Sequence, residues 1–249
     1  MELTHVPLLQ VQRELYQLPR GVERFRAYLQ TMVDDGTGDL RLPLAAMNPM
    51  GKDHLPIILD RLFHLGAEEV AIAATLEATE RVQDEPGAYQ VGLVVSDDLL
   101  GGWTNRYTSE FSYRFQQKAY HRRGWLAVVL WTSETYSAAR VREEVLLCIY
   151  RAWYAQQHGY AQTLGEMLSQ EEQAMRMAGM GGLLLEAEDV AYTREVLSAY
   201  LSRSDPPTVL GALFGDEAAH HLGYRPLGLS PRAGLALAQA NALGATAFP

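Results

Sequence analysis

The second half of the chain has the hydrophobic spacing of helices. In residues 142–156, apolar side chains recur every three or four positions, at Val145, Ile149 and Trp153. The same spacing predicts further helices at 163–178, 186–202, 209–214 and 231–243. The first of these opens with Thr163-Leu164-Gly165-Glu166, the pattern of a capping box. We therefore expect helices from about residue 137 onward and no long strand after residue 140.

The first third of the chain also favours helices, separated by turn residues. Residues 7–33 predict two helices around the break Pro19-Arg20-Gly21. A further helix begins near Asp53 and stops at Gly66, and another follows over 67–82. Residues 40–47 alternate poorly, which leaves a short strand and an extended connector as alternatives.

The middle of the chain contains the strand signals. Residues 89–95 and 125–131 are rich in β-branched and aromatic side chains, and the second run contains two valines and two tryptophans. In residues 107–115 the aromatic side chains all fall at odd-numbered positions, so they would share one face of a strand. Three of these aromatic residues also fit one face of a helix. We favour a strand over 107–115.

These elements predict a mixed α+β fold that is predominantly helical, with a small central sheet. We expect helix to exceed strand by at least two to one. Residues 1–160 are expected to form an α/β core with the sheet, and residues 161–249 a helical C-terminal subdomain packed on that core. A chain of 249 residues buries roughly three quarters of its unfolded surface, so it needs neither a metal nor a disulfide to fold.

Charge and cysteine content narrow the partners and the compartment. The net charge of −9 disfavours nucleic acids and anionic membranes, although one basic stretch occurs at 114–123. The single cysteine, Cys148, lies among apolar residues and predicts a buried thiol in a reducing compartment. The N-terminus has no apolar core of a signal peptide, and no apolar run is long enough to span a bilayer. We expect a cytoplasmic protein.

A scarcity of lysine and asparagine indicates a G- and C-rich bacterial genome. Lys52 and Lys118 are the two lysines, and the three asparagines are Asn48, Asn105 and Asn241. Three of these five fall in the most unusual polar segments of the chain, which gives those segments some additional weight.

The first polar segment follows the strand predicted at 89–95. Asp97 and Asp98 are candidates for a general base or for ligands of a divalent cation, and Asn105 and Arg106 are candidates for holding an anionic group. The alternative is a turn in which an aspartate caps the chain and Trp103 fills the core. The candidate ligand-binding residues of this segment are Gly101, Gly102, Trp103, Thr104, Asn105 and Arg106.

Two more polar segments carry candidate chemistry. After residue 131, Ser133 and Glu134 lead into the N-terminus of a predicted helix. This segment could form an anion pocket, and the alternative is that it simply caps the helix. In 48–54, Asn48 and Lys52 are candidate ligand-binding residues and His54 a candidate acid or base. The alternative is that Asp53 caps the helix while Lys52 and His54 are solvated.

The chain contains none of the standard catalytic motifs, such as a Walker loop, GxGxxG, HExxH or GxSxG. We expect an enzyme or ligand-binding protein that acts on a polar, anionic small molecule, by hydrolysis or group transfer with metal assistance left open. The alternative is a non-enzymatic helical interaction or regulatory protein. Four tryptophans and 13 tyrosines also suggest a homodimer.

Strand direction decides whether the carboxylates of the first two segments can share a site. If the two strands run parallel, Glu134 reaches the same edge of the sheet as Asp97 and Asp98. If they run antiparallel, Glu134 lies at the opposite edge and the site loses that member.

Overall fold

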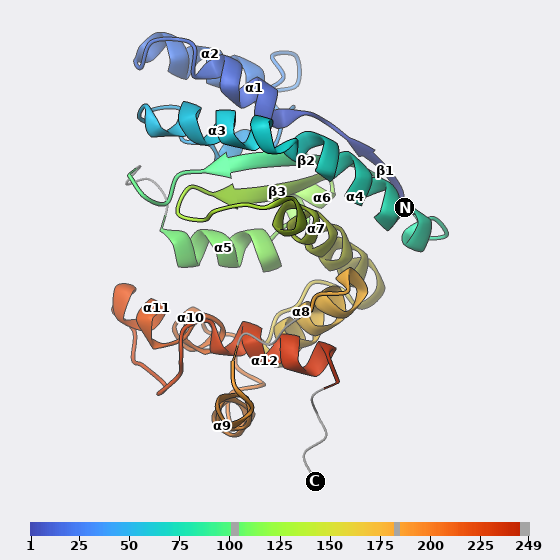
Figure 1. Cartoon of the computed structure of the whole chain (residues 1–249), viewed down its shortest axis with the longest axis vertical. Helices are drawn as coiled ribbons and strands as arrows, with labels where there is room; N and C mark the ends of the chain where they lie inside the picture. The colour runs from blue at the N-terminus through green and yellow to red at the C-terminus, as the bar shows by residue number, and fades with distance from the viewer. Residues whose placement is uncertain (101–104, 182–184, 245–249) are drawn as a thin grey trace. The chain divides into compact units, whose positions relative to one another are not determined.

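A computed structural model describes residues 1–100, 105–181 and 185–244 (Figure 1). The candidate residues Gly101, Gly102, Trp103 and Thr104 lie outside the described residues. The chain divides into two compact units, one formed by 1–109 and 117–149, the other by 110–116 and 150–249.

Unit 1 is built on a three-stranded parallel sheet. Its strands are β1 (Glu2–His5), β2 (Ala88–Ser96) and β3 (Trp125–Trp131), in the order β1-β2-β3. β2 and β3 pair over seven residues, from Gln90 beside Trp125 to Ser96 beside Trp131. Every residue of β3 and the last six of β2 are buried, as expected for a parallel sheet covered on both faces. The predictions of β2 and β3 are confirmed, whereas β1 is too short to show a hydrophobic period.

The helices of the first third end where the sequence has turn residues. They are α1 (Leu8–Leu15), α2 (Val22–Met32), the 3-10 helix η1 (Leu44–Ala46), α3 (His54–Leu65) and α4 (Ala67–Val82). Gly66 separates α3 from α4 with a φ of 72°, a left-handed conformation that favours glycine. The segment 40–47 contains η1 within a connector and forms no strand; Leu40 makes an isolated bridge with Val33. Helices α1 and α4 pack against the strands.

The prediction of a strand over 107–115 is wrong, because these residues form helix α5 (Arg106–Phe115). The buried residues of α5 are Glu110, with Arg114 and Phe115 four and five positions after it. Glu110 and Arg114 form an ion pair at i and i+4, a geometry that a helix provides and a strand does not. The aromatic residues alternate as they would in a strand, but the buried face of this segment is a helix face that contains the charged pair Glu110 and Arg114. A short helix, α6 (Lys118–His121), follows.

All regular elements among the described residues of unit 2 are helices. Helix α7 (Ala138–His158) contributes to both units and is followed by α8 (Leu164–Ala178), α9 (Ala187–Ser198), α10 (Pro206–Phe214), α11 (Asp216–His221) and α12 (Ala233–Ala242). The capping box predicted for α8 is present. Helix α12 packs on α8, α9 and α10, and a Cβ on Gly234 would lie 2.5 Å from the carbonyl oxygen of Ala212. Within the described part of the chain, no strand follows β3.

A buried ionic network joins four segments of unit 2. Glu171 is fully buried and receives hydrogen bonds from Arg151 Nε at 2.7 Å and from Arg114 Nη1 at 2.5 Å. Arg114 also bonds Glu110, whose carboxylate in turn accepts two hydrogen bonds from Arg232. Because Arg114 is buried in this network, the basic stretch at 114–123 is not a continuous basic surface.

Helices account for 58% of the chain, and the strands have 4, 9 and 7 residues, so the predicted excess of helix is confirmed. The fold is a mixed α+β fold that is predominantly helical. No helix among the described residues combines the length and the apolar character needed to cross a membrane.

Candidate functional site

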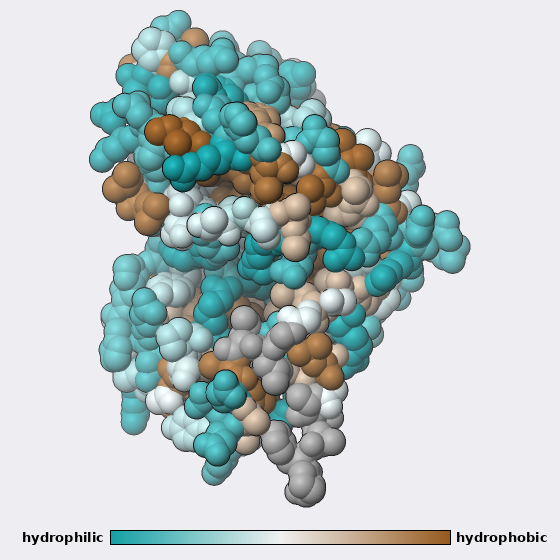
Figure 2. Space-filling view, in the orientation of Figure 1, coloured by the Kyte–Doolittle hydropathy of each residue, from teal (hydrophilic) through white to brown (hydrophobic). Residues whose placement is uncertain are grey.

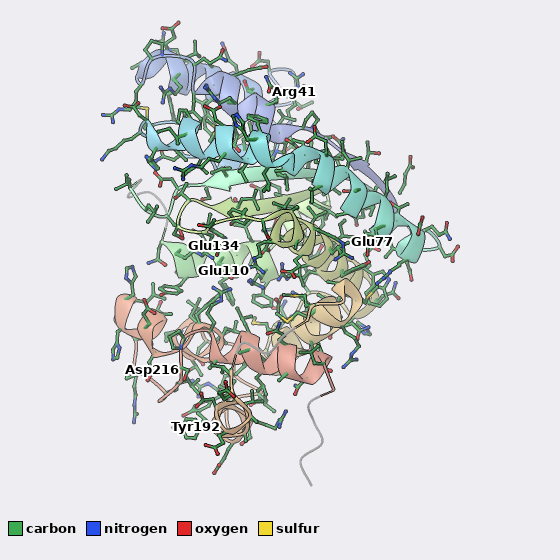
Figure 3. The ribbon with its side chains drawn as sticks, in the orientation of Figure 1. Arg41, Glu77, Glu110, Glu134, Tyr192 and Asp216 are labelled. Atoms are coloured by element: carbon green, nitrogen blue, oxygen red, sulfur yellow. The ribbon has the colours of Figure 1, made fainter. Side chains whose placement is uncertain are left out.

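The polar segments that follow β2 and β3 meet at one edge of the sheet. β2 and β3 are parallel and end level with each other, at Ser96 and Trp131. The backbone N–H of Thr132 donates to the carbonyl oxygen of Ser96 at 3.1 Å, which extends the pairing one residue past the strands. Asp98 and Glu134 therefore lie on neighbouring loops. Figure 3 labels Glu134 on the loop after β3.

Asp98 fastens these two loops together. Its Oδ1 accepts the backbone N–H of Ser133 at 2.9 Å, and its Oδ2 accepts Ser133 Oγ at 2.6 Å and Arg106 Nη1 at 2.9 Å. Thr132 Oγ1 lies 3.0 Å from Oδ1. Burial raises the pKa of Asp98, but the hydrogen bonds from Ser133 and Arg106 outweigh it and hold the pKa below its usual range. Asp98 is therefore a buried carboxylate whose oxygens both have protein donors.

Arg106 is held between two carboxylates. It is the first residue of α5, and its guanidinium bonds Asp98 through Nη1 and Glu134 through Nη2. The guanidinium carbon also lies 4.3 Å from the centre of the Trp131 ring. Asn105 caps the same helix, because its Oδ1 accepts the backbone N–H of Thr108 at 3.1 Å. In this arrangement Arg106 positions the loops.

His54 and Asp97 form a second pair. His54 Nε2 lies 3.0 Å from Asp97 Oδ1, which also accepts the backbone N–H of Leu100 at 3.1 Å and contacts Thr132 Oγ1 at 3.1 Å. Burial raises the pKa of Asp97, and the bonds from His54, Leu100 and Thr132 lower it further than burial raises it. An ionised Asp97 fixes the His54 proton on Nε2. His54 is thereby oriented at the start of α3.

Two atoms of this pair are buried without a hydrogen-bond partner among the described residues, Asp97 Oδ2 and His54 Nδ1. Nδ1 is the atom that would accept a proton when Nε2 donates to Asp97. Because Nδ1 is buried, a molecule in solvent does not reach it in this arrangement. Asp97 therefore fixes the orientation of the His54 ring, and the ring does not offer a ligand a free basic nitrogen.

A pocket of about 390 Å³ lies beside this edge of the sheet. One complete face of α3 lines it, with side chains spaced three and four residues apart. These are His54, Ile57, Ile58, Arg61, Leu62 and Leu65. The remaining described lining comes from the two loops, with Leu99 and Leu100 after β2 and residues 132–136 after β3. The volume is in the range of pockets that hold one small molecule.

The structure brings only some of the predicted residues to this pocket. His54, Ser133 and Glu134 line it; Asp97, Asp98 and Arg106 do not, but they bond to residues that do. The predictions missed the apolar lining from α3 and the loop residues Leu99, Leu100 and Tyr136. A signal was present, because α3 has more apolar side chains than one core-facing stripe needs. Leu55, Leu59 and Leu62 face the core, and Ile57 remains 53% exposed.

The segment at 48–54 contributes His54 alone to the pocket. Asn48 is buried, and it shapes a turn in which its Oδ1 accepts the backbone N–H of Met50 at 3.0 Å. Its carbonyl oxygen accepts the hydroxyl of Tyr16 at 2.7 Å. Lys52 is exposed and does not line the pocket. As the alternative has it, Asp53 occupies the N-cap position of α3 and Lys52 is exposed, but the Asp53 side chain makes no capping hydrogen bond in the described structure.

Among the described residues, no three His, Cys, Asp or Glu side chains are placed to share a metal ion. Cys148 is half-buried, with Sγ 3.7 Å from the carbonyl oxygen of Ala127. Comparisons with protein-family models, with curated proteins and with solved structures found no match.

Proposed function

We propose that unit 1 binds a small organic molecule with an apolar body in the pocket along α3. The observation that carries this proposal is that a whole helix face, from His54 to Leu65, lines a cavity. The cavity lies at the carboxyl edge of parallel strands, where sheets of this kind place their ligands. Burying the apolar part of a ligand against Ile57, Ile58 and Leu65 supplies the driving force.

The polar residues at the sheet edge keep this pocket in shape. Asp97 orients His54, and Asp98 with Arg106 fixes the loop that carries Ser133 and Glu134. Glu134 then places a carboxylate beside an otherwise aliphatic surface, and the oriented His54 ring forms one end of that surface. Binding is the better-supported role, because hydrolysis or group transfer through His54 requires its buried Nδ1 to reach the ligand.

A different feature favours the alternative, a non-enzymatic interaction protein. Patches of apolar side chains interrupt the polar surface (Figure 2), and Val22, Phe25 and Leu29 are exposed along one face of α2. A homodimer belongs to this proposal. Trp125 and Trp131 do not support it, since both are buried in β3.

Binding of the neutral fluorophore N-phenyl-1-naphthylamine tests the proposed pocket. We expect a saturable fluorescence increase with one molecule bound per chain. Ile57→Gln removes an apolar contact from the pocket and should weaken binding about fivefold, since partial burial of such a side chain is worth about 1 kcal/mol. Leu76→Gln is the matched control, because Leu76 is 62% exposed on α4 and does not line the pocket.

Two results would contradict the proposal. The first is the absence of saturable binding to the folded wild-type protein, which would leave the interaction protein as the better reading. The second is equal weakening by Ile57→Gln and Leu76→Gln, which would indicate that the fluorophore binds exposed apolar side chains in general.

A further inference from the structure

Arg61 is the exposed cation of the pocket-lining face of α3. It lies one turn after Ile57 and Ile58 and is followed by Leu62 and Leu65, so apolar side chains flank it on both sides. Within the described part of the chain, its side chain forms no ion pair and no hydrogen bond. Arg61 therefore presents a positive charge in the middle of an aliphatic surface.

The other charged lining residue does not cancel this charge. Glu134 is bonded by Arg106 and also lies 3.9 Å from Arg140, so its carboxylate already faces cations. Asp97 and Asp98 do not line the pocket. The described lining thus has one positive charge that has no protein counterion.

Tyr136 adds a hydrogen-bond donor to the same pocket. Its oxygen accepts the backbone N–H of Trp131 at 2.6 Å, and its own O–H proton has no acceptor in the described ranges. Burial and the nearby carboxylate of Glu134 raise the pKa of Tyr136, so the hydroxyl keeps its proton at neutral pH. A phenol in this state can donate to an anionic oxygen and cannot repel it.

We infer that the pocket selects amphipathic organic anions and that Arg61 is the residue that pairs with their acidic group. This inference rests on the proposed function and names the class of its ligand. The lining from Ile57 to Leu65 extends about 12 Å along α3, at 1.5 Å per residue. A ligand of this class has an apolar body of that length and one carboxylate, sulfonate or phosphate group. Arg106 does not take this role, because Asp98 and Glu134 occupy its guanidinium.

The test compares two fluorophores that differ in charge. 8-Anilinonaphthalene-1-sulfonate has nearly the same aromatic body as N-phenyl-1-naphthylamine and adds one sulfonate. In the wild-type protein we expect the anion to bind more tightly than the neutral molecule. The ratio of the two affinities should fall about tenfold in Arg61→Gln, and Arg61→Lys should recover most of it.

The matched control is Arg26→Gln, which removes an exposed arginine of α2 that lies outside the pocket and should leave the ratio unchanged. Circular dichroism establishes that each variant is folded. An unchanged ratio in a folded Arg61→Gln protein that still binds the neutral fluorophore would overturn the inference and leave the proposed function standing. Failure of the wild-type protein to bind either fluorophore would overturn both.

Discussion

Gln12 provides a sharp test of how the sheet edge is supported. It is fully buried in α1, and its side-chain amide bonds both backbone groups of Val95. Nε2 donates to the carbonyl oxygen at 3.0 Å, and Oε1 accepts the N–H at 2.8 Å. β1 has already ended at His5, which pairs with Val91. Gln12 therefore takes the place of a neighbouring strand two residues before Asp97.

Replacement of Gln12 by leucine keeps the approximate volume and removes both hydrogen bonds. The N–H and the C=O of Val95 are then buried without partners, at about 1–3 kcal/mol each. The apolar leucine side chain gains about 1 kcal/mol from its own burial. Taken together, these contributions lead us to expect that Gln12→Leu lowers the free energy of unfolding by about 1–5 kcal/mol.

The control is Gln10→Leu on the same helix, where the glutamine is exposed and donates a hydrogen bond to Glu14 at i+4. Urea denaturation followed by tryptophan fluorescence measures stability, and amide hydrogen exchange measures the opening of Val95. Exchange at Val95 should accelerate in Gln12→Leu alone. If Gln12→Leu were within about 0.5 kcal/mol of Gln10→Leu, with Val95 still protected, the reasoning would be refuted.

Two further predictions concern buried charge and pH. Glu171→Gln removes the negative charge between Arg151 and Arg114 and should cost about 3–5 kcal/mol in urea denaturation. Glu172→Gln, which breaks only an exposed i,i+4 pair, should cost less than about 0.5 kcal/mol, and equal losses would contradict the argument. Burial lowers the pKa of His121 from 6.5 to about 4, so the unfolded chain binds the extra proton and stability decreases as pH falls from about 6.5 toward 4. Urea denaturation across this range should show a smaller pH dependence in His121→Gln, and an unchanged dependence would show that another group is responsible.

The sequence predicts the elements whose signals are local. α3 and α4 are separated at Gly66, which takes a positive φ. β3 has the predicted bounds, because all seven of its residues are buried and the strand is therefore visible in the sequence as one continuous apolar run. α5 could not be predicted in this way. Its buried residues include Glu110 and Arg114, and their partners Glu171 and Arg232 are more than 50 residues away in the sequence. A pattern that counts only apolar positions treats these two residues as solvent-facing.

The candidate site shows the same limit. Residue types at the strand ends indicated Asp98, Arg106 and Glu134, and the parallel strands bring these three together. The pairing of His54 with Asp97 was not predicted, because it joins a helix start to a strand end 43 residues later. Whether these residues act on a ligand stays a prediction, and the orientation of each side chain depends on neighbours that the local sequence does not specify.

The partners of the charged residues explain why recognition shifts to α3. A buried carboxylate is costly unless donors surround it, so Asp98 is stable only because Ser133 and Arg106 satisfy it. The same bonds occupy the groups that looked suited to a ligand in the sequence. Arg61, placed in an apolar helix face, has no such partner in the described chain. A charge that the fold does not use internally is the one available to a ligand, and the pocket offers that charge beside an aliphatic surface.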